Sequence, residues 1–102
     1  MDLVRHYLAR AAASDLDAYV AQFTDDAVVE DEDRLHHGRT AIRAWRAGTP
    51  RVDQRLRTVE ETAEGYRADV EVSGDFPGSP VTLTYRFDVA QEGIRRLTIR
   101  PA

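Results

Sequence analysis

An acidic residue near the end of a predicted strand is the side chain best placed to do chemistry in this sequence. Residues 27–33 read Ala-Val-Val-Glu-Asp-Glu-Asp. Successive side chains of a strand point to opposite faces, so Asp31 shares a face with Ala27 and Val29. If that face is turned to the core, Asp31 enters or borders an apolar interior. There the carboxylate is either a general acid or base, or a charged strand end that leans back into water.

Two histidines directly after this strand could suggest a metal site together with Asp31 and Asp33. Adjacent histidines in a loop do not readily turn toward one ion, and no third histidine at a ligand spacing supports them. We therefore expect no metal and no cofactor. We expect His36 at the edge of a pocket, because histidine changes charge near neutral pH.

The composition limits the chemistry further. The chain has 102 residues, of which 42% are hydrophobic and 31% charged, as expected for one globular domain over residues 1–102. Cysteine and lysine are both absent, which excludes thiolate nucleophiles, Schiff-base catalysis and the phosphate-loop lysine. A net charge of −4 argues against nucleic acid as a partner. The first residues lack the pattern of a signal peptide and no apolar run is long enough to span a bilayer, so we expect a cytoplasmic protein without membrane contact.

The hydrophobic periodicity changes along the chain from helical to alternating. The predicted helices cover residues 2–13, 14–23 and 41–45, and the predicted strands cover residues 27–33, 52–59, 66–72, 81–89 and 94–100. Residues 34–38 are predicted to form a loop. Helices followed by consecutive strands predict an α+β fold, with the helices on one face of an antiparallel sheet.

Other side chains are predicted to line or support a pocket on the covered face. Leu83 and Tyr85 alternate inward along the strand at 81–89. Trp45 lies on the apolar side of the third helix, where it packs in the core or forms a pocket wall. Tyr7 belongs to the apolar stripe of the first helix, where a tyrosine is usually a core residue whose hydroxyl finds a partner.

Four sequence motifs in the first half of the chain carry a family resemblance. They are Tyr7-Leu8, Ser14-Asp15-Leu16-Asp17, the run Phe23-Thr24-Asp25-Asp26-Ala27-Val28-Val29-Glu30-Asp31, and Gly38-Arg39-Thr40-Ala41-Ile42. With this order of elements, the chain resembles the nuclear transport factor 2-like superfamily, in particular its SnoaL-like and ketosteroid-isomerase-like branches. The resemblance implies a cone-shaped, curved sheet wrapped by helices, a pocket inside it, and frequent homodimers.

The resemblance also implies roles for single residues. Tyr7 falls where such isomerases place the tyrosine that donates to a developing oxyanion, and Asp31 falls where they place the general base. The protonated aspartic acid of those enzymes is replaced here by Leu83, and loss of an oxyanion donor can cost about 10²–10³ in rate. A general base and a phenol therefore remain, without the second acid.

Three hypotheses follow for function. The first is isomerase or cyclase-type proton transfer on a small apolar or carbonyl compound, with Asp31 and Tyr7 as catalytic residues and Trp45, His36, Leu83 and Tyr85 as binding residues. The second is a non-catalytic ligand-binding or dimerisation module of the same fold. The third, epoxide hydrolysis, would need a second inward acid and either Arg39 or Arg86 near Asp31. The alternation of the later strands points Arg86 outward, which disfavours epoxide hydrolysis. We also expect a homodimer through the outer face of the sheet.

Overall fold

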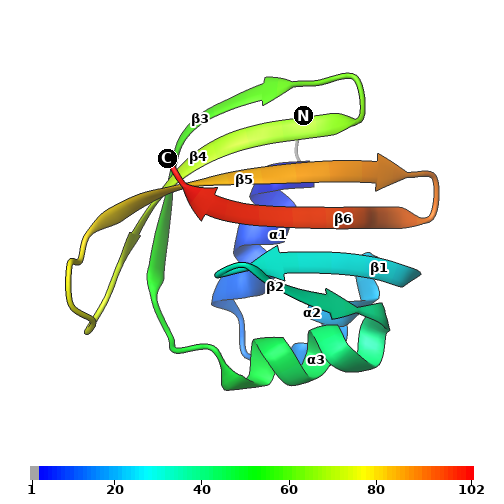
Figure 1. Cartoon of the computed structure of the whole chain (residues 1–102), viewed down its shortest axis with the longest axis horizontal. Helices are drawn as coiled ribbons and strands as arrows, with labels where there is room; N and C mark the ends of the chain where they lie inside the picture. Colours follow the sequence, from blue (N-terminus) through cyan, green and yellow to red (C-terminus); the bar gives the residue numbers. More distant parts are fainter. Residues whose placement is uncertain (1–2) are drawn as a thin grey trace.

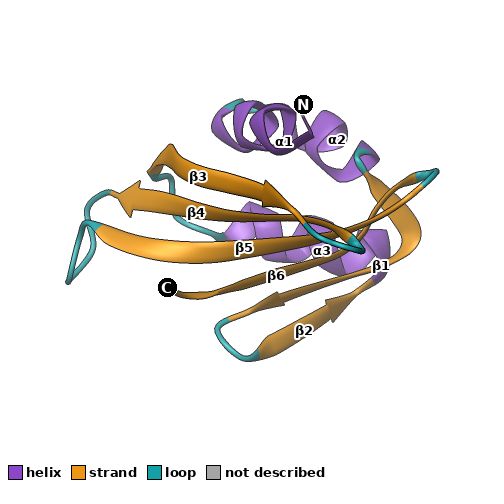
Figure 2. Ribbon diagram, turned by 90° about the horizontal axis from the view of Figure 1, so that it is seen from above, coloured by secondary structure: helices purple, strands orange, loops and turns teal. Residues whose placement is uncertain are grey.

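The computed structural model describes residues 3–102, in which three helices pack against a six-stranded, curved and unclosed sheet (Figures 1 and 2). The helices are α1 (Leu3–Ala12), α2 (Leu16–Ala21) and α3 (Gly38–Gly48). The strands are β1 (Phe23–Asp31), β2 (Arg34–His37), β3 (Asp53–Glu61), β4 (Gly65–Ser73), β5 (Val81–Ala90) and β6 (Gly93–Pro101). The predicted α+β fold is confirmed. The predicted start of the first helix at residue 2 lies outside the described residues.

The strand order is β2-β1-β6-β5-β4-β3. All neighbouring strands are antiparallel except β1 and β6, which run parallel side by side in Figure 1. The expectation of a purely antiparallel sheet is therefore wrong at this one pair. Parallel neighbours need a long crossover, and here everything from β2 to β5 forms the connection. The alternation of apolar and polar residues indicates which face of a strand is buried, but it does not indicate which other strand lies beside it in the sheet.

The inner face of the sheet carries the core. Its fully buried members include Val29 from β1, Val70 from β4, Phe87 from β5 and Leu97 from β6. Figure 2 shows α1 and α2 together on one side of the sheet, and α3 packs against α2, β1 and β2. None of the helices within residues 3–102 is long and apolar enough to cross a membrane.

The segment around β1 differs from its predicted boundaries. The strand begins at Phe23 instead of Ala27 and ends at Asp31, and the predicted loop after it is the strand β2. Glu32 and Asp33 form the turn of a β-hairpin with φ values of 52° and 62°. Positive φ at both central residues is the geometry of the tight turns that match the twist of paired strands. Asp33 is thus a turn residue, and Asp31 is the last strand residue on the inner face.

On the outer face, Glu30 joins β1 to β6 through two arginines. Its side chain accepts hydrogen bonds from Arg96 Nη2 (3.1 Å) and from Arg100 Nε (3.0 Å) and Nη2 (2.8 Å). Glu30 is only 9% exposed. The structure thus shows a buried acid bound by charge-assisted hydrogen bonds.

This cluster predicts a specific dependence of stability on pH. The hydrogen bond from Arg100, assisted by Arg96, lowers the pKa of Glu30 below its ordinary value of 4.5. A lowered folded-state pKa contributes stability above the unfolded-state pKa, and this contribution is lost as the pH falls through the folded-state value. We expect Glu30→Gln to lower the melting temperature at neutral pH and to flatten its fall below about pH 4.5. Melting curves between pH 3 and 7 (roughly the carboxylate range) measure this effect.

The matched control is Glu60→Gln. Glu60 pairs with Arg67 at 3.3 Å, but its side chain is 63% exposed, and an exposed pair of this kind contributes little. Its pH profile should parallel that of the wild type. If the melting temperatures of both Glu30→Gln and Glu60→Gln followed pH in parallel with the wild type, the Glu30 cluster would not couple protonation to folding.

Candidate functional site

A cavity of about 490 Å³ opens between the inner face of the sheet, α1 and the end of α3. We call it the interior cavity. Its apolar lining residues are Val52, Val72, Phe76, Val81, Leu83 and Ile99. Its polar and aromatic lining residues are Tyr7, Asp31, Trp45, Arg46, Gln54 and Tyr85, and its exposed lining residues include Glu32, Asp33 and Arg100. An apolar space with a few polar groups is the usual form of a small-molecule site.

Asp31 lies at the end of β1 and is half-buried in the wall of the interior cavity. Trp45 Nε1 donates a hydrogen bond to Asp31 Oδ2 at 3.1 Å. In the described part of the chain, this is the one hydrogen bond that the Asp31 side chain accepts. The indole fixes one carboxylate oxygen and leaves the other available to a ligand.

Three tyrosines line or support the wall of the cavity. The hydroxyl oxygens of Tyr7 and Tyr19 are 2.7 Å apart, and Gln54 Nε2 donates to the hydroxyl of Tyr85 at 2.8 Å. The ring centroids of Tyr7 and Tyr85 are 6.1 Å apart. Because Gln54 acts as the donor, the hydroxyl hydrogen of Tyr85 remains free to donate.

Burial raises the pKa of all three phenols. It raises the pKa of Tyr85 to about 12, against a lowering contribution from the Gln54 hydrogen bond. Burial is also the largest cause that raises the pKa of Tyr7 and Tyr19 well above the ordinary value of 10. The tyrosines therefore stay protonated at neutral pH, as hydrogen-bond donors to a developing negative charge must be.

Arg46 was not among the predicted site residues. It follows Trp45 in α3, and its Nη2 donates to the carbonyl oxygen of Ala11 at 2.5 Å. Its guanidinium carbon lies 4.8 Å from the centroid of the Tyr19 ring, a cation–π contact. The signal that could have identified it is its spacing of four residues from the fully buried Ile42, which places both on one helix face. Gln54 was missed as well, although it lies two residues before the inward-facing Leu56.

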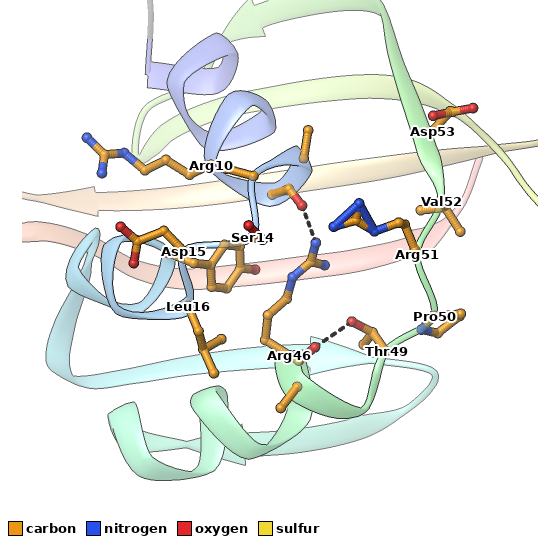
Figure 3. Close-up of a pocket in the computed structure, with 15 residues that line it drawn as sticks. Arg10, Ser14, Asp15, Leu16, Arg46, Thr49, Pro50, Arg51, Val52 and Asp53 are labelled. Atoms are coloured by element: carbon orange, nitrogen blue, oxygen red, sulfur yellow. Dashed lines mark hydrogen bonds between the residues drawn. The ribbon is translucent and has the colours of Figure 1, made fainter.

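Arg46 also borders a second, more polar space, which Figure 3 shows in close-up. This space of about 350 Å³ is lined by residues 10–16, Tyr19 and residues 46, 47 and 49–53. We call it the arginine pocket. It shares Arg46, Thr49, Pro50 and Val52 with the interior cavity, so these residues lie at the boundary of both spaces.

Most of the predicted site residues come together. Asp31, Tyr7, Trp45, Leu83 and Tyr85 all line the interior cavity.

His36 does not line the interior cavity. Its ring packs against that of Trp45, with centroids 5.7 Å apart. Within residues 3–102, no three histidine, aspartate or glutamate side chains are grouped so that they could hold a metal ion.

The geometry does not favour epoxide hydrolysis by the predicted arginines. Arg39 donates to the carbonyl oxygen of Phe23 and pairs with Asp25, away from the interior cavity. Arg86 is exposed on β5 and alternates with the inward-facing Tyr85. Neither arginine is near enough to Asp31 to form an ion pair with it.

Comparisons with known proteins give a family. A model of the SnoaL-like domain matches residues 4–97. The chain is 36% identical to a candidate polyketide cyclase from Sinorhizobium meliloti, with a TM-score of 0.92 over 98% of this chain and 94% of that one. It is 28% identical to a protein from Sphaerobacter thermophilus, with a TM-score of 0.75 over 99% of this chain and 94% of that one.

More distant similarity supports the fold alone. The epoxide hydrolase/cyclase-like enzyme SalBIII, from pyran ring formation in salinomycin, is 21% identical, with a TM-score of 0.82 over 99% of this chain and 88% of that one. A search of curated protein sequences gives no match. The family match and the S. meliloti protein together show that this chain belongs to the SnoaL-like family, with the nuclear transport factor 2-like fold.

Proposed function

We propose that this protein binds a small carbonyl compound in the interior cavity and catalyses proton transfer at the carbon next to the carbonyl. The observation that carries the proposal is the half-buried Asp31 carboxylate. The Trp45 indole holds one of its oxygens, and the neutral hydroxyls of Tyr7 and Tyr85 share its cavity. A base and nearby oxyanion donors in a partly apolar space are what enolisation requires.

Asp31 removes a proton from the carbon next to the carbonyl, and the C–H electron pair forms an enolate whose charge is carried by oxygen. Tyr85, whose hydroxyl accepts from Gln54, donates to this oxygen. Tyr7 donates as well when Tyr19 acts as the donor in their shared hydrogen bond. Return of the proton from Asp31 to another carbon of the conjugated enolate gives an isomerase. Attack of the enolate carbon on a second carbonyl forms a C–C bond and an alkoxide, which takes the proton from Asp31, and this gives a cyclase.

The similarity to the candidate polyketide cyclase from S. meliloti supports the cyclase form of the reaction. The competing proposal is a non-catalytic ligand-binding module, which the apolar walls of the cavity would serve equally well. No step of the proposed reaction requires a cofactor.

Hydrogen exchange separates the two proposals without a known substrate. A panel of cyclic ketones and enones is incubated with the protein in deuterated water, and deuterium uptake next to the carbonyl is followed by NMR. We expect uptake above the buffer rate for at least one compound. Binding of panel members without any uptake would support the ligand-binding module and contradict the enzyme.

We further propose a homodimer formed through the outer face of the sheet. That face carries Thr82, Thr84 and Arg86 on a central strand, next to the Arg96–Glu30–Arg100 cluster of β6 and β1. It is a broad surface of mixed polarity of the kind found in protein interfaces.

The single-domain organisation of residues 1–102 and the cytoplasmic location stay predictions from the sequence.

Sedimentation equilibrium at tens of micromolar (roughly the range of weak dimers) tests this proposal. We expect a dimer for the wild type and a monomer for Arg86→Glu. The reversed charge should not harm the fold, because Arg86 lies directly opposite Arg67 on β4. Arg5→Glu, exposed on α1, is the matched control and should remain dimeric. A wild-type monomer at these concentrations would contradict the dimer.

A further inference from the structure

Arg46 is a half-buried cation without an acidic partner. A guanidinium has more N–H donors than any other side chain. Among the hydrogen bonds of residues 3–102, Arg46 makes one from this group, to the carbonyl oxygen of Ala11. No carboxylate in that part of the chain comes within ion-pairing distance of it. Buried charges are normally paired. Arg46 has the Ala11 carbonyl and the face of the Tyr19 ring as partners, so its remaining N–H groups are available to a charged ligand beside the two spaces.

The arginine pocket reinforces the positive charge around Arg46. In Figure 3 the side chains of Arg46 and Arg51 both extend into this space. The carboxylates that could neutralise them point elsewhere. Asp15 caps α2 by accepting a hydrogen bond from Ala18 N, and the side chain of Asp53 points away from the pocket. The arginine pocket is therefore lined by more positive than negative side chains, with Arg10, Arg46 and Arg51 against Asp15 and Asp53, and Arg46 lies at its boundary with the interior cavity.

Acidic residues that line the interior cavity work against an anion. Glu32 and Asp33 are exposed, so water and salt screen their charges strongly. Asp31 is half-buried and repels an anion most strongly close to its own carboxylate. Arg100 also lines the cavity; it shares the single Glu30 carboxylate with Arg96, and its exposed side chain is screened by water and salt. The interior cavity is thus lined by a half-buried acid, Asp31, and by a half-buried cation without an acidic partner in the described part of the chain, Arg46.

We propose that the natural ligand carries an oxyanion group, such as a carboxylate, which Arg46 binds where the interior cavity meets the arginine pocket. Arg51 adds a weaker, solvent-screened attraction to the same group. The substrate class is thereby narrowed to anionic carbonyl compounds, whose uncharged carbonyl end faces Asp31 and Tyr85. This inference rests on the proposed function for the carbonyl end only. Recognition of the anion is a property of binding and needs no turnover.

Trp45 provides a direct binding signal, because it is the only tryptophan in the chain and its indole contacts Asp31 in the cavity wall. The probes are 4-oxocyclohexane-1-carboxylate, its methyl ester and the analogue that carries a trimethylammonium group in place of the carboxylate, so that only the charge at position 1 differs. We expect the carboxylate to bind the wild type about ten- to a hundred-fold more tightly than the ester, as a charged hydrogen bond allows. This preference should shrink as salt is added, because only the carboxylate interaction is ionic.

The variants give a graded expectation. Arg46→Met should abolish the preference for the carboxylate while ester binding persists. Arg51→Gln should reduce the preference only about two- to three-fold, because exposed ionic contacts contribute little. Arg43→Gln is the matched control: Arg43 lies one turn earlier in α3, is exposed and pairs with Asp17, and its loss should change nothing.

Several results would overturn the inference. They are equal affinity of the wild type for acid and ester, tightest binding of the trimethylammonium compound, no binding of the carboxylate up to about 20 mM, or an Arg46→Met variant that keeps the preference. If Arg46→Met fails to fold, the charge series and its salt dependence on the wild type decide alone. If the protein prefers the carboxylate but catalyses no deuterium uptake, the anion site is supported and the proposed enzyme activity is contradicted. If it catalyses uptake without preferring the carboxylate, the enzyme activity is supported and the anion site is contradicted.

Discussion

Asp31→Asn is expected to reduce deuterium uptake next to the carbonyl by about 10²–10⁴-fold, the usual contribution of a general base. The amide has nearly the shape of the carboxylate, so its oxygen can still accept the Trp45 hydrogen bond and the fold should be retained. What is lost is the basic oxygen. Uptake of deuterium by the active member of the ketone panel, measured by NMR under identical conditions, gives the ratio of rates.

The neighbouring acid supplies the matched control for this experiment. Asp33 lines the same cavity but lies in the hairpin turn at a φ of 62°, which asparagine tolerates well. Asp33→Asn removes the same charge without removing the proposed base, so its uptake should stay within about two-fold of the wild type. An Asp31→Asn variant that exchanges as fast as the wild type would exclude Asp31 as the base.

Tyr7→Phe should slow uptake less than Asp31→Asn does. The hydroxyl of Tyr7 already shares a hydrogen bond with Tyr19, and Tyr85 remains as a second donor supported by Gln54. Loss of one oxyanion donor among two is expected to cost about ten- to a hundred-fold. A larger loss for Tyr85→Phe than for Tyr7→Phe would identify Tyr85 as the principal donor.

The inner face of β1 shows what the sequence alone could predict. The alternation of Ala27, Val29 and Asp31 correctly predicted that Asp31 borders the core side of the sheet. The prediction succeeds because every second residue of a strand points to the same face. The same argument correctly predicted that Leu83 and Tyr85 point inward. These residues lie within continuous strands whose pattern is not interrupted.

Arg46 and the turn at residues 32–33 show where the sequence was insufficient. A charged residue in a polar helix end is usually solvated, and only the contacts with Ala11 and Tyr19, some 30 residues away, bring Arg46 into the cavity wall. The turn was missed because Glu32 and Asp33 continue the alternation without a glycine or asparagine. Their turn conformation follows from the pairing of β1 with β2, which is a tertiary contact.

The interior cavity depends on the packing beneath it, and Phe87→Ala is expected to reveal this through stability. Phe87 is 1% exposed, and its ring centroid lies 5.2 Å from that of Tyr7 and 6.3 Å from that of Tyr85. Truncation of a buried phenylalanine to alanine costs about 3–5 kcal/mol, because apolar contacts are lost and a cavity remains. For a small domain this is a large part of a total stability of about 5–15 kcal/mol. Urea or thermal unfolding of wild type and variant measures the difference.

Phe76→Ala tests a residue of the cavity wall, whereas Phe87→Ala tests the packing that supports the cavity. Phe76 lines the interior cavity from the loop between β4 and β5 and is only half-buried. Its truncation should cost about 1 kcal/mol or less in stability but should weaken ligand binding, because it removes apolar surface that contacts the ligand. Phe87→Leu, which keeps most of the volume, should fall between the two in stability. If Phe87→Ala were no more destabilising than Phe76→Ala, the Tyr7 and Tyr85 rings would not be held by Phe87, and the hydroxyls would lack the fixed positions that oxyanion stabilisation requires.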